Sequence, residues 1–237
     1  TPSHHRVHHA INPEYIDKNY GQILILWDKL FGTFQAEIDN VKPVYGTLKP
    51  VSTWNPVIIN YKHFWQLMKD AWRAERYFDK IRIWFMPTGW RPVDVKEKFP
   101  LLEVTNPAKQ SKYNTTNSRW MLAYSWTQLI ITHLLLLHLL IVFSSHSNTM
   151  NYLYAIVLLL SVFSFTSMLD KNKYAFVAEL LKASMVFVLL YIQNLSWYGL
   201  QGFPIYLLIM YIIFSLVLTF YFQKNEKNNS IVNPSPV

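Results

Sequence analysis

The chain of 237 residues contains no cysteine. Within this chain, a disulfide framework, a thiolate metal site and a cysteine nucleophile are therefore excluded. Any metal ion that the chain binds must be held by nitrogen or oxygen ligands, from histidine, carboxylate, amide or water.

Charged residues are also scarce, at 15% of the chain, whereas about a quarter is typical of soluble domains. Hydrophobic residues make up 51% and aromatic residues 16%. This composition indicates an integral membrane protein. The net charge of +8 favours basic cytoplasmic loops beside anionic lipid, and no motif for nucleic acid accompanies it, so nucleic acid is not an expected partner.

Long apolar runs begin after Arg119 and predict four transmembrane helices, at 121–143, 152–168, 176–192 and 203–222. Each run is close to the length that crosses a hydrocarbon core of about 30 Å. We therefore expect an all-α integral membrane protein with three parts. Residues 1–118 carry a histidine-rich helical segment and interfacial helices, residues 119–222 form the four spans, and residues 223–237 form a disordered tail rich in Asn, Lys and Pro.

Polar side chains inside the expected spans need partners. Glu179 and Lys182 are three residues apart near the end of a span, which predicts a local ion pair or snorkelling to the interface. His133 and His138 lie about 140° apart around a helix, so we do not expect them to share a metal ion.

Histidine is unusually dense at the start of the chain, where His4, His5, His8 and His9 occur together. His5, His8 and His9 form the pattern H-x-x-H-H, whose members share one face of a helix. Neutral imidazole nitrogen is a good ligand for iron, zinc or copper, so the pattern predicts a metal site. The alternatives are a solvated histidine patch or the remnant of an expression tag, although a tag is usually an unbroken run.

Three acidic or amide side chains follow this cluster. Asp17 and Asn19 are predicted either to orient an imidazole or to serve as turn and cap residues, and both interpretations stay open. Asp28 is a further candidate for supporting the ligands, although a surface ion pair with Lys29 or a helix cap would also explain it.

Residues 21–34 are predicted to form a buried helix. Trp27 and Phe31 lie one turn apart in it, and we expect them to pack in a core rather than to contact substrate.

The histidine cluster and the residues after it resemble the last histidine box of the fatty acid hydroxylase and sterol desaturase superfamily. The trailing motifs are N-Y-G at 19–21 and W-D-x-x-F-G-T-F at 27–34. Within the superfamily the chain is most similar to the alkylglycerol monooxygenases and their bacterial relatives, membrane enzymes that cleave ether lipids. The resemblance continues through V-Y-G at 44–46 and P-T-G-W at 87–90, and weakly into the apolar segments.

This resemblance implies a di-iron oxidoreductase in which His5, His8 and His9 bind iron and His4 is a fourth ligand or a neighbour of the ligands. It implies dioxygen and a membrane lipid as substrates, with tetrahydrobiopterin as a possible electron donor. Hydroxylation of the ether-bond carbon of an alkylglycerol would give a hemiacetal that collapses to a fatty aldehyde and a glycerol derivative.

The family carries further histidine boxes upstream, and no second H-x-x-H-H occurs in this chain. We therefore expect the chain to be the C-terminal part of a longer protein and to be inactive alone. Two alternatives stay open. One is a sterol or fatty-acyl hydroxylase or desaturase of the same superfamily, and the other is a non-catalytic metal-binding membrane protein.

Aromatic and basic residues alternate at helical spacing through 61–85, which predicts helices that lie in the membrane interface. The segments on either side, 35–56 and 87–118, are predicted to be an irregular connection and a polar surface linker.

The distribution of Lys and Arg predicts the topology. Residues up to Arg119 hold 17 of the 22 basic residues, the loops at 144–151 and 193–202 have none, and Lys171 and Lys173 lie between the second and third spans. The histidine cluster, the 170–174 loop and the tail are therefore expected on the cytoplasmic side. The membrane would be the endoplasmic reticulum in a eukaryote and the cytoplasmic membrane in a bacterium.

The absence of native cysteine allows this topology to be tested by labelling intact cells with an impermeant thiol reagent. Single variants Ser147→Cys, Asn172→Cys and Ser230→Cys probe one outer and two inner positions. Only the cysteine at 147 should react. Labelling at 172 or 230 in its place would contradict four spans with a cytoplasmic histidine cluster.

Overall fold

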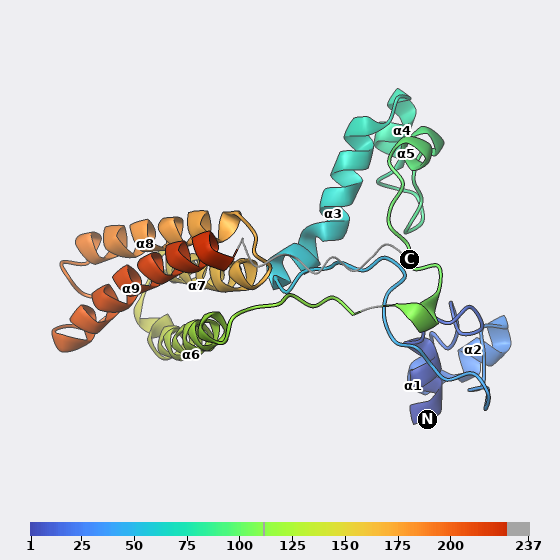
Figure 1. The fold of residues 1–237 in the computed structure, drawn as a ribbon, viewed down its shortest axis with the longest axis horizontal. Helices are drawn as coiled ribbons and strands as arrows, with labels where there is room; N and C mark the ends of the chain where they lie inside the picture. The colour runs from blue at the N-terminus through green and yellow to red at the C-terminus, as the bar shows by residue number, and fades with distance from the viewer. Residues whose placement is uncertain (111, 227–237) are drawn as a thin grey trace. The chain divides into compact units, whose positions relative to one another are not determined.

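The computed structural model describes residues 1–110 and 112–226, which divide into two compact units (Figure 1). Among the described residues, the first unit comprises 1–52, 64–110 and 112, and the second comprises 53–63 and 113–226. Helices are the regular structure of both units, and the described residues contain no strand, only isolated bridges such as the one between Ala10 and Tyr45. The expected all-α class is confirmed.

The first unit is built from short helices joined by irregular segments. Its elements are α1 (Pro2–His8), η1 (Gln22–Leu24), α2 (Leu26–Phe31), most of α3 (Pro56–Arg73), α4 (Tyr77–Arg82), α5 (Val93–Lys98) and η2 (Pro107–Lys109). Residues 35–52 contain no helix, as expected for an irregular connection.

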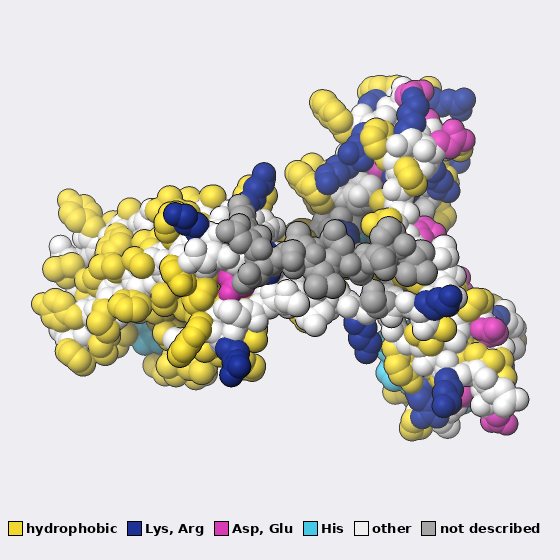
Figure 2. Space-filling model, viewed as in Figure 1, with side chains coloured by type: hydrophobic (Ala, Val, Ile, Leu, Met, Phe, Trp, Pro, Cys, Tyr) yellow, Lys and Arg dark blue, Asp and Glu magenta, His cyan; other side chains and the backbone are white. Residues whose placement is uncertain are grey.

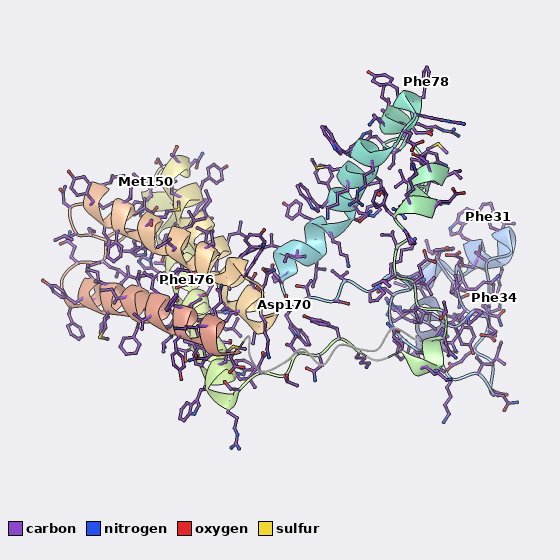
Figure 3. All side chains as sticks on the ribbon, turned by 45° about the horizontal axis from the view of Figure 1, so that its top comes forward. Phe31, Phe34, Phe78, Met150, Asp170 and Phe176 are labelled. Carbon is purple, nitrogen blue, oxygen red and sulfur yellow. The ribbon has the colours of Figure 1, made fainter. Side chains whose placement is uncertain are left out.

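The prediction of one buried helix over 21–34 was wrong. Gly32 ends α2 in the left-handed conformation, with φ of 74°, which favours glycine. Trp27 and Phe31 are 54% and 72% exposed and stack on each other, with ring centroids 6.0 Å apart. The reason is that α2 buries its acid, Asp28, and turns its apolar side chains outward, as Phe31 in Figure 3 illustrates.

Residues 87–118 are also more structured than a surface linker. They include α5, and Arg91 is buried against α3, where its Nε lies 2.6 Å from Oδ2 of Asp70. A second Arg91 nitrogen, Nη2, donates to the carbonyl of Phe99. Each charge of this buried pair depends on the other, because removing one partner would leave an uncompensated charge. The pair therefore holds Arg91, and with it the chain after α4, against α3.

Aromatic side chains stand exposed along α3 and α4. Trp72 and Phe78 are 86% and 83% exposed, and Phe78 projects from α4 in Figure 3. Lysine and arginine side chains lie among the apolar ones on this part of the molecule (Figure 2). An exposed apolar surface with interleaved cations is what an interfacial helix requires, and the interfacial location stays a prediction.

The described residues of the second unit contain four long apolar helices, which Figure 1 labels α6 to α9. They are α6 (Arg119–Val142), which continues into η3 (Phe143–Ser145), α7 (Asn148–Leu169), α8 (Tyr174–Ile192) and α9 (Phe203–Asn225). All four are long and apolar enough to cross a membrane, which confirms the expected spans. Helix α9 runs to Asn225 and so includes the start of the predicted tail, whereas 227–237 lie outside the described residues.

Short polar side chains begin two of these helices. Ser118 and Ser147 accept hydrogen bonds from the backbone N–H groups of Met121 and Met150, at 3.2 and 3.4 Å. These contacts satisfy donors that the first turn of a helix leaves without a partner. Apolar side chains cover most of the face of the four helices that Figure 2 shows, as lipid-facing spans require.

The ion pair between Glu179 and Lys182 is confirmed, but the alternative of snorkelling was wrong. Lys182 Nζ lies 2.5 Å from Glu179 Oε1, and both side chains are 1% exposed. The pair lies within α8, and Ser215 of α9 donates to Glu179 and accepts from Lys182. The two charges therefore connect α8 to α9 in the interior of the unit.

His133 and His138 have separate partners. His133 Nδ1 contacts the carbonyl of Leu129, one turn earlier in α6, at 2.8 Å. His138 Nδ1 lies 3.2 Å from the hydroxyl of Tyr154 on α7. Each histidine therefore has its own hydrogen-bond partner, His133 within α6 and His138 on α7.

The buried ion pair makes a sharp prediction for stability. Lys182→Met leaves the Glu179 carboxylate buried without its partner and should lower the free energy of unfolding by about 3 kcal/mol or more. The double variant Glu179→Leu/Lys182→Met removes both charges and should recover most of that loss. Unfolding in mixed micelles measures both. A single variant as stable as the wild type would show that the pair does not hold α8 to α9.

Candidate metal centre

Helix α1 carries the histidine cluster at the start of the first unit. The Thr1 side chain caps the helix by accepting from the N–H of His4, and Pro2 occupies the first turn, where a missing N–H costs nothing. Val7 is fully buried and packs with Ala10 and Tyr15. One face of the helix is therefore anchored in a small core, and the histidines occupy the remaining surface.

An ion pair and a hydrogen bond with Glu37 also hold α1 on its exposed side. Glu37 accepts from Arg6, at 2.5 Å between Nη2 and Oε2, and from the hydroxyl of Ser3 at 2.8 Å. The hydrogen bonds from Arg6 lower the pKa of the Glu37 carboxyl below its usual value. The segment 35–41 is thus fastened to the helix by charge as well as by packing.

The structure brings the three histidines of the H-x-x-H-H pattern together. Ring centroids are 4.4 Å apart for His5 and His9, 5.1 Å for His8 and His9, and 6.4 Å for His5 and His8. His4 lies differently, since its ring packs edge-on against Phe34 with centroids 5.4 Å apart. The shared helix face is as expected, whereas the ring of His4 contacts Phe34.

The three imidazoles are of the residue type that binds iron, zinc or copper. His8 Nδ1 lies 3.4 Å from the carbonyl oxygen of Lys18, a contact that would leave Nε2 for the metal. His4 Nδ1 is buried without a hydrogen-bond partner. Among residues 1–110 and 112–226, no group of three His, Asp or Glu side chains has a geometry that could hold a metal ion.

A hollow of about 400 Å³ opens beside two of the histidines. It is lined by His5, Arg6, His9, Tyr45 and Gly46. Ile11 donates to the carbonyl of Val44 at 2.8 Å, which places the 44–46 segment against the end of α1. At Gly46 a Cβ atom would lie 3.0 Å from Oε1 of Gln110, the far end of a flexible side chain.

Tyr45 lines this hollow, but it was not among the candidate residues predicted from the sequence. The V-Y-G motif at 44–46 was the only signal that pointed to it.

Asn19 braces the histidine helix rather than an imidazole ring. Its side chain is fully buried, donates to the carbonyl oxygens of His4 and Gln35, and accepts from the N–H of Gln35 at 2.9 Å. Its backbone has φ of 56°, a left-handed conformation that asparagine tolerates better than most residues. The interpretation as a turn residue therefore holds, whereas the side-chain hydrogen bonds of Asn19 go to backbone groups and not to an imidazole.

Asp28 organises the loop that faces the histidine cluster. Its carboxylate accepts from the N–H of Gly21 at 2.8 Å and from the hydroxyl of Thr33 at 2.7 Å. Burial opposes its ionisation, but the hydrogen bonds from Thr33 and Gly21, together with the nearby His8, lower the pKa of Asp28 below its ordinary value. The W-D and G-T motifs at 27–28 and 32–33 are thus explained by one carboxylate that closes a loop.

Asp17 is exposed and reaches the histidines only indirectly. Its Oδ1 accepts from the hydroxyl of Tyr20 at 2.7 Å, and the Tyr20 ring lies 6.2 Å from that of His8 between centroids. A direct contact of Asp17 with an imidazole is therefore not part of this arrangement.

Comparison with known proteins connects the chain with alkylglycerol monooxygenases. It is 39% identical to the human alkylglycerol monooxygenase over 132 residues, covering 54% of this chain and 28% of the human protein. It is 40% identical over 119 residues to the Caenorhabditis elegans protein of that name, covering 46% of this chain and 23% of that protein. For the Danio rerio protein the values are 44% over 95 residues, 39% and 20%.

The chain thus spans about a quarter of the length of these relatives, and the similarity supports a relationship to them over that part. No family model matches the chain, and no solved structure matches it.

Variants of Asp28 test the loop. Asp28→Ala removes the acceptor for the N–H of Gly21 and should greatly reduce the protection of that amide against hydrogen exchange. Asp28→Asn should retain most of it, because an amide oxygen still accepts from Gly21 while the Thr33 hydroxyl can turn to accept from the amide. The exposed Asp39→Ala is the matched control. Equal protection in Asp28→Ala and Asp39→Ala would contradict the assigned role.

Proposed function

We propose that this chain is the part of an iron-dependent membrane monooxygenase that carries a histidine box, and that the enzyme hydroxylates the ether-bond carbon of alkylglycerols. The observation that carries the proposal is the triad of His5, His8 and His9 on one face of α1 beside an open hollow. The named relatives support the reaction class, and the four apolar helices support a lipid substrate.

In this proposal His5, His8 and His9 hold iron through neutral imidazole nitrogen, with His4 beside them. Iron supplies the activation of dioxygen that an inert C–H bond requires. The reaction takes one oxygen atom into the C–H bond and reduces the other to water, using two electrons and two protons. We propose tetrahydrobiopterin as the electron donor, and a second set of iron ligands from a part of the enzyme outside this chain.

The product of hydroxylation explains how an ether bond is cleaved without hydrolysis. A hydroxyl group on the carbon next to the ether oxygen makes a hemiacetal. Loss of the hydroxyl proton and expulsion of the glycerol oxygen, which takes up a proton, give a fatty aldehyde and a glycerol derivative. We propose that Tyr45, which lines the hollow with His5 and His9, contacts the substrate.

The location follows from the distribution of charge. We propose that the histidine box and the C-terminus face the cytoplasm, in the endoplasmic reticulum of a eukaryote or the cytoplasmic membrane of a bacterium. The box would then lie on the side where soluble reductants are regenerated. The sequence N-L-S at 194–196 matches the pattern for N-linked glycosylation. It would lie on the opposite side, between α8 and α9 and close to the membrane surface.

The metal assignment is tested in the full-length protein by His8→Ala. Removing a ligand should lower bound iron and reduce ether cleavage by more than about 100-fold, since even the outer partners of metal ligands contribute 10–100-fold. His133→Ala, within α6, is the control and should retain iron and most activity. A folded His8→Ala protein with normal iron content would refute the assignment, and so would loss of iron in His133→Ala.

A further inference from the structure

A row of large exposed side chains runs along α3, and the proposed reaction does not use it. Tyr61, Trp65, Met68 and Trp72 follow one another at steps of four, three and four residues, so they lie on one side of the helix. All four are exposed, from 41% for Met68 to 86% for Trp72. We call these four residues the aromatic row. A continuous apolar row of this kind indicates a contact with something other than water.

The opposite side of α3 is covered by the chain itself. Asp70 lies roughly 170° around the helix from the middle of the aromatic row, and its carboxylate is buried against Arg91. Next to it, the guanidinium group of Arg73 lies 4.1 Å from the centre of the Phe99 ring. The helix therefore packs against residues 91–99 with its polar side and leaves its aromatic row exposed.

Helix α4 and the turn after it extend the exposed apolar surface. The rings of Phe64 and Trp84 are 6.0 Å apart between centroids, which joins this turn to α3. Phe78 and Phe85 are each 83% exposed. The apolar surface is thus formed by two helices of the first unit rather than by one isolated side chain.

Cations lie beside the aromatic row and along α4. None of the ion pairs among residues 1–110 and 112–226 includes any of four of them, Lys69, Arg76, Lys80 and Arg82. The ammonium group of Lys69 lies 5.9 Å from the centre of the Trp65 ring, and the guanidinium group of Arg82 lies 5.3 Å from that of Trp90. Aromatic side chains on one side of a helix with cations beside them are typical of helices that lie on anionic membranes.

The start of α3 is fastened to the end of an apolar helix of the second unit. Asn55 precedes α3, and its side chain donates to the hydroxyl of Ser167 on α7 at 2.7 Å. Asp170, directly after α7, accepts from the backbone N–H of Trp54 at 2.9 Å. Because α7 is long and apolar enough to cross a membrane, its end lies near a membrane surface, and α3 begins close to that surface.

We propose that the aromatic row of α3 and the exposed face of α4 lie among the lipid head groups, and that the neighbouring cations bind anionic phospholipid. Aromatic rings bury apolar area at this depth, and long basic side chains reach the phosphates from the same position. A net negative head group attracts these cations more strongly than a zwitterionic one does. The inference concerns lipid contact alone and does not depend on the proposed reaction.

The test measures quenching of a fluorophore on the full-length protein in bilayer nanodiscs. Because the chain has no cysteine, Met68→Cys and Glu97→Cys place the fluorophore on the aromatic row or on the exposed surface of α5, with any cysteine outside this chain replaced. The quencher is a nitroxide near the glycerol of phosphatidylglycerol or phosphatidylcholine. At position 68 both lipids should quench, with an apparent association about fivefold stronger for phosphatidylglycerol, the effect of one basic residue near an anionic surface. At position 97 iodide in the water should quench and the lipids should not.

One pair of variants tests the cations. Lys69→Gln/Arg76→Gln removes two charges beside the aromatic row and should abolish most of the preference for phosphatidylglycerol. Lys42→Gln/Lys96→Gln removes two charges from exposed positions elsewhere in the first unit and should leave the preference intact. A preference that survives the first change, or that is lost equally in both, would overturn the role of the cations.

A second pair tests the aromatic side chains. Trp72→Ala/Phe78→Ala should weaken quenching at position 68 by both lipids, because the helices lose apolar area that the head-group region buries. Val93→Ala/Leu102→Ala changes two side chains that are 71% and 86% exposed outside this surface and should have little effect.

Three results at position 68 would overturn the proposal. Quenching by iodide as strong as at position 97 would show that the aromatic row faces water. Quenching by neither the lipids nor iodide would show that another part of the enzyme covers the row. Equal quenching by the two lipids would show that the surface does not select anionic lipid.

Discussion

The candidate metal centre depends on two buried polar side chains that hold one short helix in place. Helix α1 has only seven residues, too few to be stable through its own hydrogen bonds. Asn19 connects its backbone to Gln35, and Asp28 closes the loop that brings Thr33 and Gln35 back toward it. The hydrogen bonds of both side chains go to backbone or hydroxyl groups, so Asn19 and Asp28 act on the backbone around α1.

The membrane unit follows a different constraint, since the bilayer core offers no water to satisfy polar groups. Its polar side chains accordingly pair inside the unit, as Glu179 and Lys182 do with Ser215. The two charges are therefore compensated within the unit, and they connect α8 to α9.

Much of the fold could be predicted from the sequence because long apolar runs have few alternatives. The four spans and the shared face of His5, His8 and His9 follow from length and helical spacing. The orientation of α2 could not be predicted in this way. Apolar residues flank Asp28 in the sequence, and hydrophobicity alone would predict that this acid faces solvent while the apolar residues face the core. Its burial depends on hydrogen bonds with Gly21 and Thr33, and spacing does not encode such contacts. Tyr45 and the pair of Asp70 and Arg91 were missed for the same reason, since their partners are distant in sequence.

The central claim is that the histidine triad of α1 binds iron. The most direct measurement is iron K-edge X-ray absorption on the full-length protein purified from membranes, compared with a His5→Ala/His9→Ala variant. The account predicts a shell of imidazole nitrogen at about 2.1 Å, with the outer-shell carbon scattering of histidine, and a clear loss of that scattering in the variant. Iron whose histidine scattering is identical in the two proteins, or a folded protein that binds no iron, would contradict it.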